Sequence, residues 1–344
     1  MKASLKSLAA LSVLACAAFS ASAQTVTLKV YHFLPAGSAA QTMFIKPWCD
    51  KIALESGDKM KCQIYPSMQL GGTPPQLFDQ VKDGVVDVTW VLPGYMAGRF
   101  PLSEVFELPF MMQSPEGTSK ALWDFVNTNP NVAAEFKDVK LLALHVHADG
   151  VFHMTGKPIK TMADLKGLKV RAPTRQTNKL LAALGATPVA MPVPAVSEAL
   201  AKSVIDGALV PYEVVPSVKI QELVKFHSET DPAEPAIYTS TFVFAMNKAK
   251  YESLPPDLKK VIDDNSGQAL SGQIGKTFLA ADGIGKKLTE KNTHNVIPAS
   301  ELQSWKKVGE QITTDWVADV TAKGANGKLL LENARALIAK YAVK

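Results

Sequence analysis

Ala163-Asp-Leu-Lys-Gly-Leu-Lys-Val-Arg-Ala-Pro173 is the stretch of sequence that decides the fold of this chain. Apolar and basic residues alternate towards its end, which is the period of a β-strand with Arg171 near the tip, and Pro173 ends that strand. Thr174 is a suitable N-cap for the helix that follows, and Gly185 suits the C-terminal cap of that helix. The stretch therefore predicts a strand followed directly by a helix, with one cation where the two meet.

Arg171 is the strongest candidate for a binding residue. Open α/β sheets bind ligands beyond the carboxyl ends of their strands, and a guanidinium holds a carboxylate through two parallel hydrogen bonds. No acidic residue occurs between Asp164 and Glu198, so a local ion-pair partner is lacking. We therefore expect Arg171 to bind a small organic anion, the alternative being an exposed surface charge. Arg175, one helical turn further, either assists it or is a solvated residue at the helix start.

The chain as a whole alternates between strands and helices. Strands are predicted at 26–33, 60–65 and 85–91 with helices between them, and the Arg171 region repeats this order. A βαβαβ order implies a parallel sheet with right-handed crossovers. A strand at 239–246 is expected to cross back to the first sheet. The fold class is therefore α/β, with two βαβ-built domains, a central cleft and crossing hinge strands.

The predicted domain boundaries follow from these crossings. Domain I comprises residues 24–147 plus about 237–275, and domain II comprises 148–236 plus about 276–335. The chain is long enough for two such domains.

Residues 1–23 have the pattern of a secretory signal peptide. Lys2 and Lys6 precede a short apolar run, and Ala21-Ser-Ala23 forms an A-x-A cleavage site. We expect cleavage after Ala23 and export to the periplasm. Lipid attachment at Cys16, within a loose lipobox, is the alternative.

Charge and hydropathy exclude several classes of protein. Removal of residues 1–23 takes away two lysines and no acidic residue, which lowers the formal net charge from +5 to +3. This balance does not favour nucleic-acid binding, and no later apolar run approaches the ~20 residues of a spanning helix. We expect an exported soluble monomer that needs no cofactor.

Cys49 and Cys62 are the two cysteines that remain after export. Cys49 belongs to a helix pattern, and Cys62 lies in the strand pattern that follows. A short return from helix to strand would bring them together, and an oxidising compartment favours a disulfide. Two separate buried thiols are the alternative.

Seven further motifs occur in a fixed order along the chain, at Tyr65–Gly72, Gly84–Asp87, Glu107–Phe110, Asp164–Arg171, Gly185–Ala186, Met191–Pro192 with Glu198–Leu200, and Asp206–Gly207. In this order they resemble the extracytoplasmic solute receptors of tripartite ATP-independent periplasmic (TRAP) transporters, of the dicarboxylate-receptor (DctP) type. The resemblance implies a two-domain cleft that closes over an organic acid whose carboxylate is bound by Arg171. It also implies delivery of the acid to a sodium-driven membrane permease, without an ATPase subunit.

Three positions depart from the sialic-acid-binding branch of that family. Val151-Phe152 stands where that branch has a second arginine, Val193 replaces an aromatic residue, and Val210 replaces an asparagine. A buried polar ligand group without a partner costs ~1–3 kcal/mol. We therefore expect a monocarboxylate with a compact apolar or aromatic body, such as mandelate, benzoylformate, benzoate or cinnamate. A branched hydroxy acid or a sugar acid is the alternative.

The candidate ligand-binding residues are Arg171 and a set of mostly apolar or aromatic neighbours: Phe33, Gln69, Trp90, Leu92, Tyr95, His147, Phe152, Val193, Val210 and Tyr212. Taken one by one, the aromatic members suit a core as well as a cleft.

Other functions remain open at this point. His145, His147 and His153 permit a metal site, although no cysteine or carboxylate completes it, and polar contacts at the cleft mouth are favoured. A secreted enzyme would need a nucleophile or base held by a partner, and the sequence offers no convincing set. A sensor domain with the same fold would present the same ligand to a signalling partner.

Overall fold

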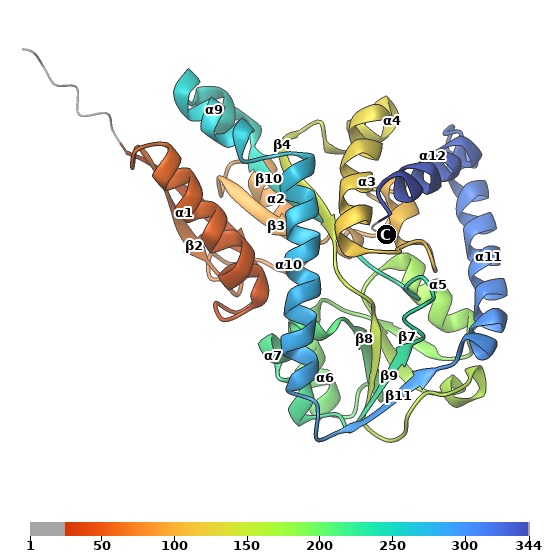
Figure 1. Cartoon of the computed structure of the whole chain (residues 1–344). Helices are drawn as coiled ribbons and strands as arrows, with labels where there is room; N and C mark the ends of the chain where they lie inside the picture. Colours follow the sequence, from red (N-terminus) through yellow and green to blue (C-terminus); the bar gives the residue numbers. More distant parts are fainter. Residues whose placement is uncertain (1–24, 343–344) are drawn as a thin grey trace, which may run out of the picture.

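The computed structural model describes residues 25–342 and contains two sheets, one in each of two lobes (Figure 1). The lobe I sheet has the order β2-β1-β3-β10-β4, and the lobe II sheet has the order β11-β9-β5-β8-β6-β7. The predicted two-lobed α/β fold is confirmed. The predicted signal peptide, its cleavage site and Cys16 lie outside the described residues. Within residues 25–342, no helix is both long and apolar enough to cross a membrane.

Lobe I is built from the first βαβαβ unit and one returning strand. Strands β1 and β2 are parallel, as are β1 and β3, while β10 lies antiparallel between β3 and β4. The predicted return of the chain at 239–246 is therefore confirmed. The strands are β1 (Val26–His32), β2 (Met60–Tyr65), β3 (Val88–Val91), β4 (Val139–Val146) and β10 (Thr241–Asn247). The helices of this lobe are α1 (Lys46–Glu55), α2 (Leu77–Lys82), α3 (Pro115–Thr128), α4 (Pro130–Ala133), α8 (Lys248–Ser253) and α9 (Pro256–Asp264).

Lobe II repeats the plan around the Arg171 strand. Strand β6 pairs in parallel with β7 and β8, and β5 is the antiparallel strand. The Thr174 side chain caps α5 by accepting from the Thr177 N–H, and Gly185 follows the helix with φ +94°. The strands are β5 (Val151–Met154), β6 (Lys169–Ala172), β7 (Thr187–Ala190), β8 (Gly207–Val210), β9 (Phe226–Thr230) and β11 (Thr293–Ile297). The helices are α5 (Arg175–Ala183), α6 (Val196–Ala201) and α7 (Val215–Val218).

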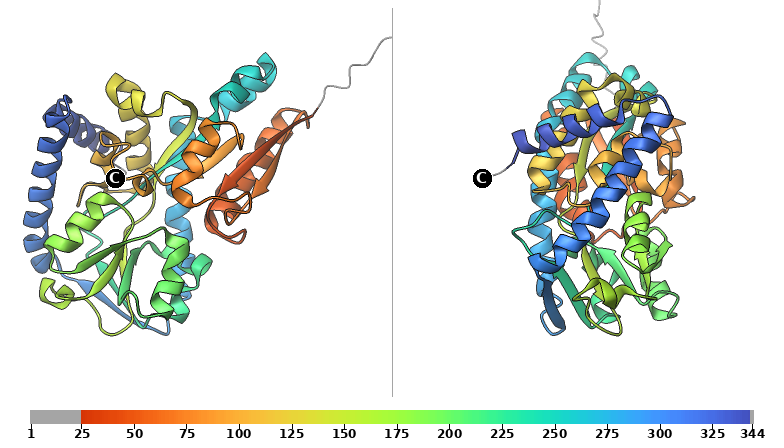
Figure 2. Two further views of the ribbon diagram at one scale, coloured as in Figure 1. Left: turned by 180° about the vertical axis from the view of Figure 1, so that it is seen from behind. Right: turned by 90° about the vertical axis from the view of Figure 1, so that its right-hand side faces the viewer.

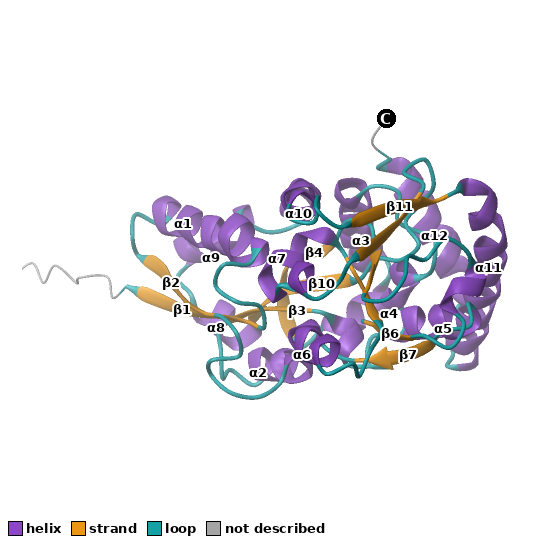
Figure 3. Ribbon diagram, turned by 90° about the horizontal axis from the view of Figure 1, so that it is seen from below, coloured by secondary structure: helices purple, strands orange, loops and turns teal. Residues whose placement is uncertain are grey.

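Several segments join the lobes. The chain crosses between β4 and β5 and returns between β9 and β10, while the long helix α10 (Gln268–Lys287) runs beside both lobes (Figure 1). Helix α11 (Ala299–Ala322) contacts α5 of lobe II, and α12 (Gly327–Lys340) returns to pack on α3 of lobe I (Figure 2). The view from below shows α11 and α12 together at the end of the molecule opposite α1, with α10 between the two ends (Figure 3). The predicted boundary at 275/276 falls inside α10, and the division into two domains at these residues stays a prediction.

The Cys49–Cys62 disulfide is present and ties α1 to β2. It closes a short loop at the outer edge of lobe I, far along the sheet from β4. Its role is therefore structural.

Candidate ligand-binding site

A cavity lies between the lobes, and both lobes contribute residues to its lining. It is reached by the carboxyl ends of parallel strands from both sheets, because Phe33 follows β1, Leu92 follows β3, and Val193 comes shortly after β7. The lining residues are Phe33, Leu34, Trp90, Leu92, Tyr95, His147, Arg171, Pro173, Val193, Val210, Pro211, Glu213, Val214, Tyr238, Ser240 and Phe242.

Arg171 enters the cavity from the tip of β6 and is only 2% exposed. Its Nε–H donates to the Met191 carbonyl and one Nη1–H donates to the Leu209 carbonyl, each at 3.0 Å. One Nη2–H lies 3.4 Å from the Tyr95 hydroxyl. A guanidinium has five N–H groups, so two are left without an acceptor in residues 25–342. No carboxylate in this range lies within 4.0 Å of the guanidinium, whose charge is therefore buried without a counter-ion.

Tyr95 connects the lobes at the same point. It belongs to the short helical turn after β3 in lobe I, and its hydroxyl oxygen accepts from the Val193 N–H of lobe II at 2.9 Å. The Tyr95 oxygen thus accepts from Val193 and faces Arg171. The Tyr95 hydroxyl proton is therefore available to an anion beside the guanidinium. Arg171 and Tyr95 together provide donors for one carboxylate.

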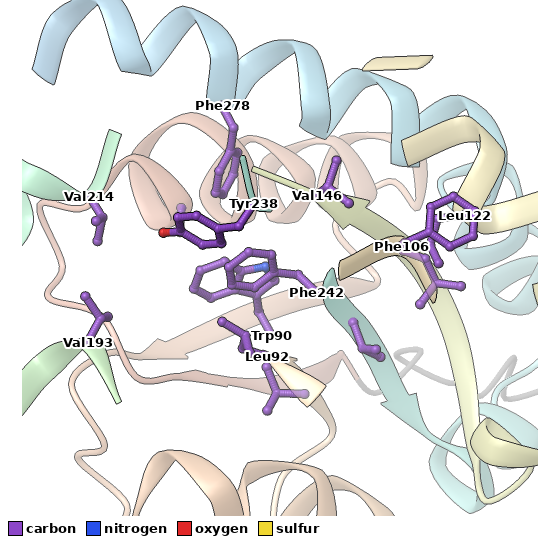
Figure 4. Packing of buried hydrophobic residues seen from close by; sticks show 14 of the residues in the cluster. Trp90, Leu92, Phe106, Leu122, Val146, Val193, Val214, Tyr238, Phe242 and Phe278 are labelled. Carbon is purple, nitrogen blue, oxygen red and sulfur yellow. The ribbon is translucent and has the colours of Figure 1, made fainter. Parts of the chain in front are cut away.

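Aromatic rings form the opposite wall of the cavity (Figure 4). Trp90 stacks on Phe33, with ring centroids 4.9 Å apart, and on Phe242, at 4.7 Å. Phe33 directly follows β1 and Phe242 belongs to β10, the two strands that flank β3, so the sheet sets the spacing of the rings. The Trp90 Nε1–H donates to His145 Nε2 at 2.8 Å, which satisfies the indole and fixes its orientation. The result is a flat, rigid apolar surface suited to an aromatic or compact apolar group.

His147 lies at the crossing from β4 to β5 and lines the cavity as a neutral ring. Its Nε2 accepts from the Ser240 N–H at 3.0 Å, and its Nδ1 pairs with the Ala148 carbonyl. Burial lowers the His147 pKa to about 4, so it adds no positive charge next to Arg171 at neutral pH. Its two ring nitrogens are occupied by the backbone, which makes it a support for the crossing segment.

The histidines do not converge on one site. His145 bonds to Trp90 in lobe I, whereas His153 pairs with His227 in lobe II. Within residues 25–342 there is no group of three or more histidine, cysteine or acidic side chains placed to hold a metal.

Three of the candidate residues lie outside the cavity. Gln69 is exposed in the loop after β2. Phe152 is fully buried and packs edge-on against Trp305 of α11. The Tyr212 hydroxyl bonds to Glu229 and His294 within lobe II. These three residues do not line the cavity in this structure, and their contact with a ligand stays a prediction. Strand alternation gives two faces but not which one meets the cavity.

The structure also brings in polar residues that sequence reasoning missed, namely Glu213, Tyr238 and Ser240. Glu213 follows β8 at the same carboxyl edge as Val210, so its position after a strand was the signal available. Tyr238 and Ser240 belong to the segment between β9 and β10, whose path depends on both lobes.

Arg175 makes an ion pair across the lobes. Its guanidinium lies 2.5 Å from Glu104 of lobe I and 3.4 Å from Asp319 of α11. The Gln176 amide also donates to Glu104, at 2.7 Å. Arg175 is therefore neither a second ligand residue nor a solvated helix start, and the lobes are held together around the cavity.

A comparison with family models gives a match over most of the chain. Residues 31–319 match the model of the DctP family, described as bacterial extracellular solute-binding protein, family 7. The chain belongs to this family. The expected family membership is thereby confirmed, and members of this family are extracytoplasmic solute receptors.

Relatives of known structure share the same architecture. The chain is 54% identical to a TRAP solute-binding protein from Rhodoferax ferrireducens T118, solved with copurified benzoate, with 92% of this chain and 98% of that chain covered and a TM-score of 0.90. It is 46% identical to a marine metagenome TRAP solute-binding protein specific for aromatic acid ligands, solved with 3-hydroxybenzoate, with 93% and 100% covered and a TM-score of 0.90.

A curated relative is more distant. The 2,3-diketo-L-gulonate-binding periplasmic protein YiaO of Escherichia coli (strain K12) is 27% identical over 274 residues, which cover 79% of this chain and 81% of that protein. These family 7 proteins are receptors and not enzymes.

Proposed function

We propose that this protein is a periplasmic receptor that binds an aromatic monocarboxylate through Arg171 and delivers it to a TRAP permease. The observation that carries the proposal is the buried guanidinium of Arg171, which has two unused N–H groups, no protein carboxylate beside it, and a cavity in front of it. A buried charge without a counter-ion is costly. A ligand carboxylate supplies the missing partner.

The body of the ligand is inferred from the remaining walls. Val193 and Val214 lie across from the Trp90 stack (Figure 4). Val210 also lines the cavity, so its walls are largely apolar. A benzene ring fits such a wall better than a sugar acid, whose hydroxyl groups would lose their partners. The aromatic acids bound by the Rhodoferax and metagenome relatives agree with this inference. A branched aliphatic hydroxy acid would fill similar walls without ring stacking.

Transport rather than catalysis follows from the same residues. Arg171 provides recognition, and neither Arg171 nor the neutral His147 ring is arranged with a nucleophile. Export through residues 1–23, a monomeric state and docking on the two membrane subunits of the permease complete the proposal.

Isothermal titration calorimetry with benzoate tests the proposal. Benzoate should bind to the wild-type protein, and Arg171→Ala should lose ~2–5 kcal/mol of binding free energy, because the carboxylate is left buried and unpaired. Lys169→Ala is the matched control: it removes an exposed cation of the same strand that does not line the cavity, so its loss should be much smaller. Absence of aromatic-acid binding to the wild type, or wild-type affinity in Arg171→Ala, would overturn the proposal.

A further inference from the structure

Two hydroxyl groups that line the cavity have no hydrogen-bond partner in residues 25–342, and a carboxyl group belongs to the same lining. The Tyr238 hydroxyl and Ser240 Oγ are buried with no partner, and their residues are 1% and 0% exposed. The Glu213 carboxyl, 7% exposed, likewise has no cation within ion-pair distance in that range. Native proteins rarely leave buried polar groups unpaired, so this cluster needs a ligand partner.

Tyr238 is fixed with its hydroxyl in the cavity. Its ring lies against the backbone of Gly150, where a Cβ would come within 1.7 Å of Cε1, and it packs edge-on against His147 with ring centroids 5.2 Å apart. Figure 4 shows the hydroxyl pointing away from the aromatic stack, towards Val193 and Val214. The ring cannot rotate away, so the hydroxyl is presented to whatever fills the cavity.

Ser240 and Glu213 are held by their backbones, which leaves their side chains available. The Ser240 N–H donates to His147 Nε2 at 3.0 Å, and the Glu213 N–H donates to Asp282 Oδ1 at 2.8 Å. Burial, together with the nearby Asp282 carboxylate, raises the Glu213 pKa well above its ordinary value. A protonated carboxyl group can donate a hydrogen bond as well as accept one.

A simple benzoate would use Arg171 and leave this second polar cluster unsatisfied. A ligand hydroxyl is both a donor and an acceptor, so it matches a mixed set of two hydroxyls and one carboxyl. We propose that Glu213, Tyr238 and Ser240 determine specificity by hydrogen-bonding a hydroxyl group of the ligand, so that hydroxylated aromatic monocarboxylates are the preferred class. This inference rests on the proposed function of Arg171.

Calorimetry with benzoate and the three ring isomers of hydroxybenzoate tests it. At least one isomer should bind the wild type about tenfold more tightly than benzoate, the order expected for one buried hydrogen bond. In Tyr238→Phe and Ser240→Ala the ratio of the two dissociation constants should fall towards one. Tyr251→Phe is the matched control, because this half-buried tyrosine of α8 does not line the cavity, and it should keep the wild-type ratio.

Two Glu213 variants refine the test. Glu213→Gln keeps a donor and an acceptor and should retain the preference, while Glu213→Leu should lose it. Tighter binding of 3-(aminomethyl)benzoate than of every hydroxybenzoate would mean that Glu213 pairs with an ammonium, and would overturn the inference.

The two proposals fail in different ways. If benzoate binds through Arg171 but all hydroxybenzoates bind equally, or if the preferred isomer is insensitive to Tyr238→Phe and Ser240→Ala, this inference is wrong and the receptor function stands. If no aromatic acid binds, or if Arg171→Ala is neutral, the proposed function itself is wrong.

Discussion

Arg171, near the end of β6, and Arg175, at the start of α5, lie four residues apart in sequence and have opposite surroundings. Arg175 reaches across to Glu104 at 2.5 Å, with Asp319 on its other side. Arg171 bonds only to backbone carbonyls and a tyrosine hydroxyl, and it faces a cavity. The two arginines therefore have different roles: Arg175 forms an ion pair between the lobes, and Arg171 is available to a ligand. The difference lies in whether the protein supplies a counter-ion, and a sequence pattern does not show this.

A substitution that places an acidic side chain beside Arg171 should have the largest effect on ligand binding. Val210 lines the cavity at the end of β8, next to the Leu209 carbonyl that Arg171 contacts. Val210→Asp should reduce aromatic-acid binding below detection, because the new carboxylate pairs with the guanidinium and repels the ligand by several kcal/mol. Val210→Asn is the matched control of similar shape without the charge, and calorimetry should find a smaller loss. Equal losses in the two variants would mean that sterics and not charge dominate.

The neutrality of His147 can be tested through pH. Burial lowers its pKa to about 4 from the model-peptide value of 6.5, so the unfolded chain binds the extra proton first. The stabilisation is therefore full above about pH 6.5 and is lost as the pH falls towards 4, up to ~3 kcal/mol.

Denaturant unfolding of the wild type and of His147→Gln, which removes the titrating ring, measures this contribution. The difference in unfolding free energy between the two proteins should shrink as the pH falls from 6.5 to 4. A constant difference would show that His147 is not held neutral by burial.

Removing the partner of Arg175 should weaken the closed form without touching the cavity. Glu104→Gln keeps the shape of the side chain but removes its charge. It should destabilise the closed form by ~1.5–3 kcal/mol, the range of a hydrogen bond to a charged group. In stopped-flow measurements we expect a faster release of benzoate with a nearly unchanged association rate. Glu198→Gln breaks an ion pair whose two side chains are 67% and 70% exposed, and should leave both rates unchanged. An unchanged rate of benzoate release in Glu104→Gln would show that this ion pair does not stabilise the closed form.

The smallest effect is expected at Gln69. This side chain is exposed and outside the cavity, so Gln69→Ala should change the affinity for benzoate by less than ~0.5 kcal/mol. A loss comparable with that of Arg171→Ala would show that the loop after β2 folds over the ligand, and would restore the sequence-based placement of this residue.

Local chemistry made much of the fold predictable. The Thr174 cap and the left-handed Gly185 lie where the strand–helix pattern placed them, and the Cys49–Cys62 disulfide and the return of β10 were also foreseen. These features depend on residues close in sequence or on simple alternation.

The features that escaped prediction depend on tertiary structure. The sequence patterns did not predict strands β9 and β11. They also did not show that α12 packs on lobe I, because that position is set by its contacts with α3. In the same way, Phe152 faces Trp305 and not the cavity, and Tyr238 reaches the cavity only because the chain crosses between the lobes beside Gly150.

A crystal structure of the protein with 3-hydroxybenzoate tests the central claim most directly. We expect the ligand carboxylate within hydrogen-bond distance, ~2.7–3.1 Å, of the Arg171 guanidinium, with its ring between Val193 and the Trp90 stack. A carboxylate bound elsewhere, with Arg171 still contacting only the Met191 and Leu209 carbonyls, would contradict the account.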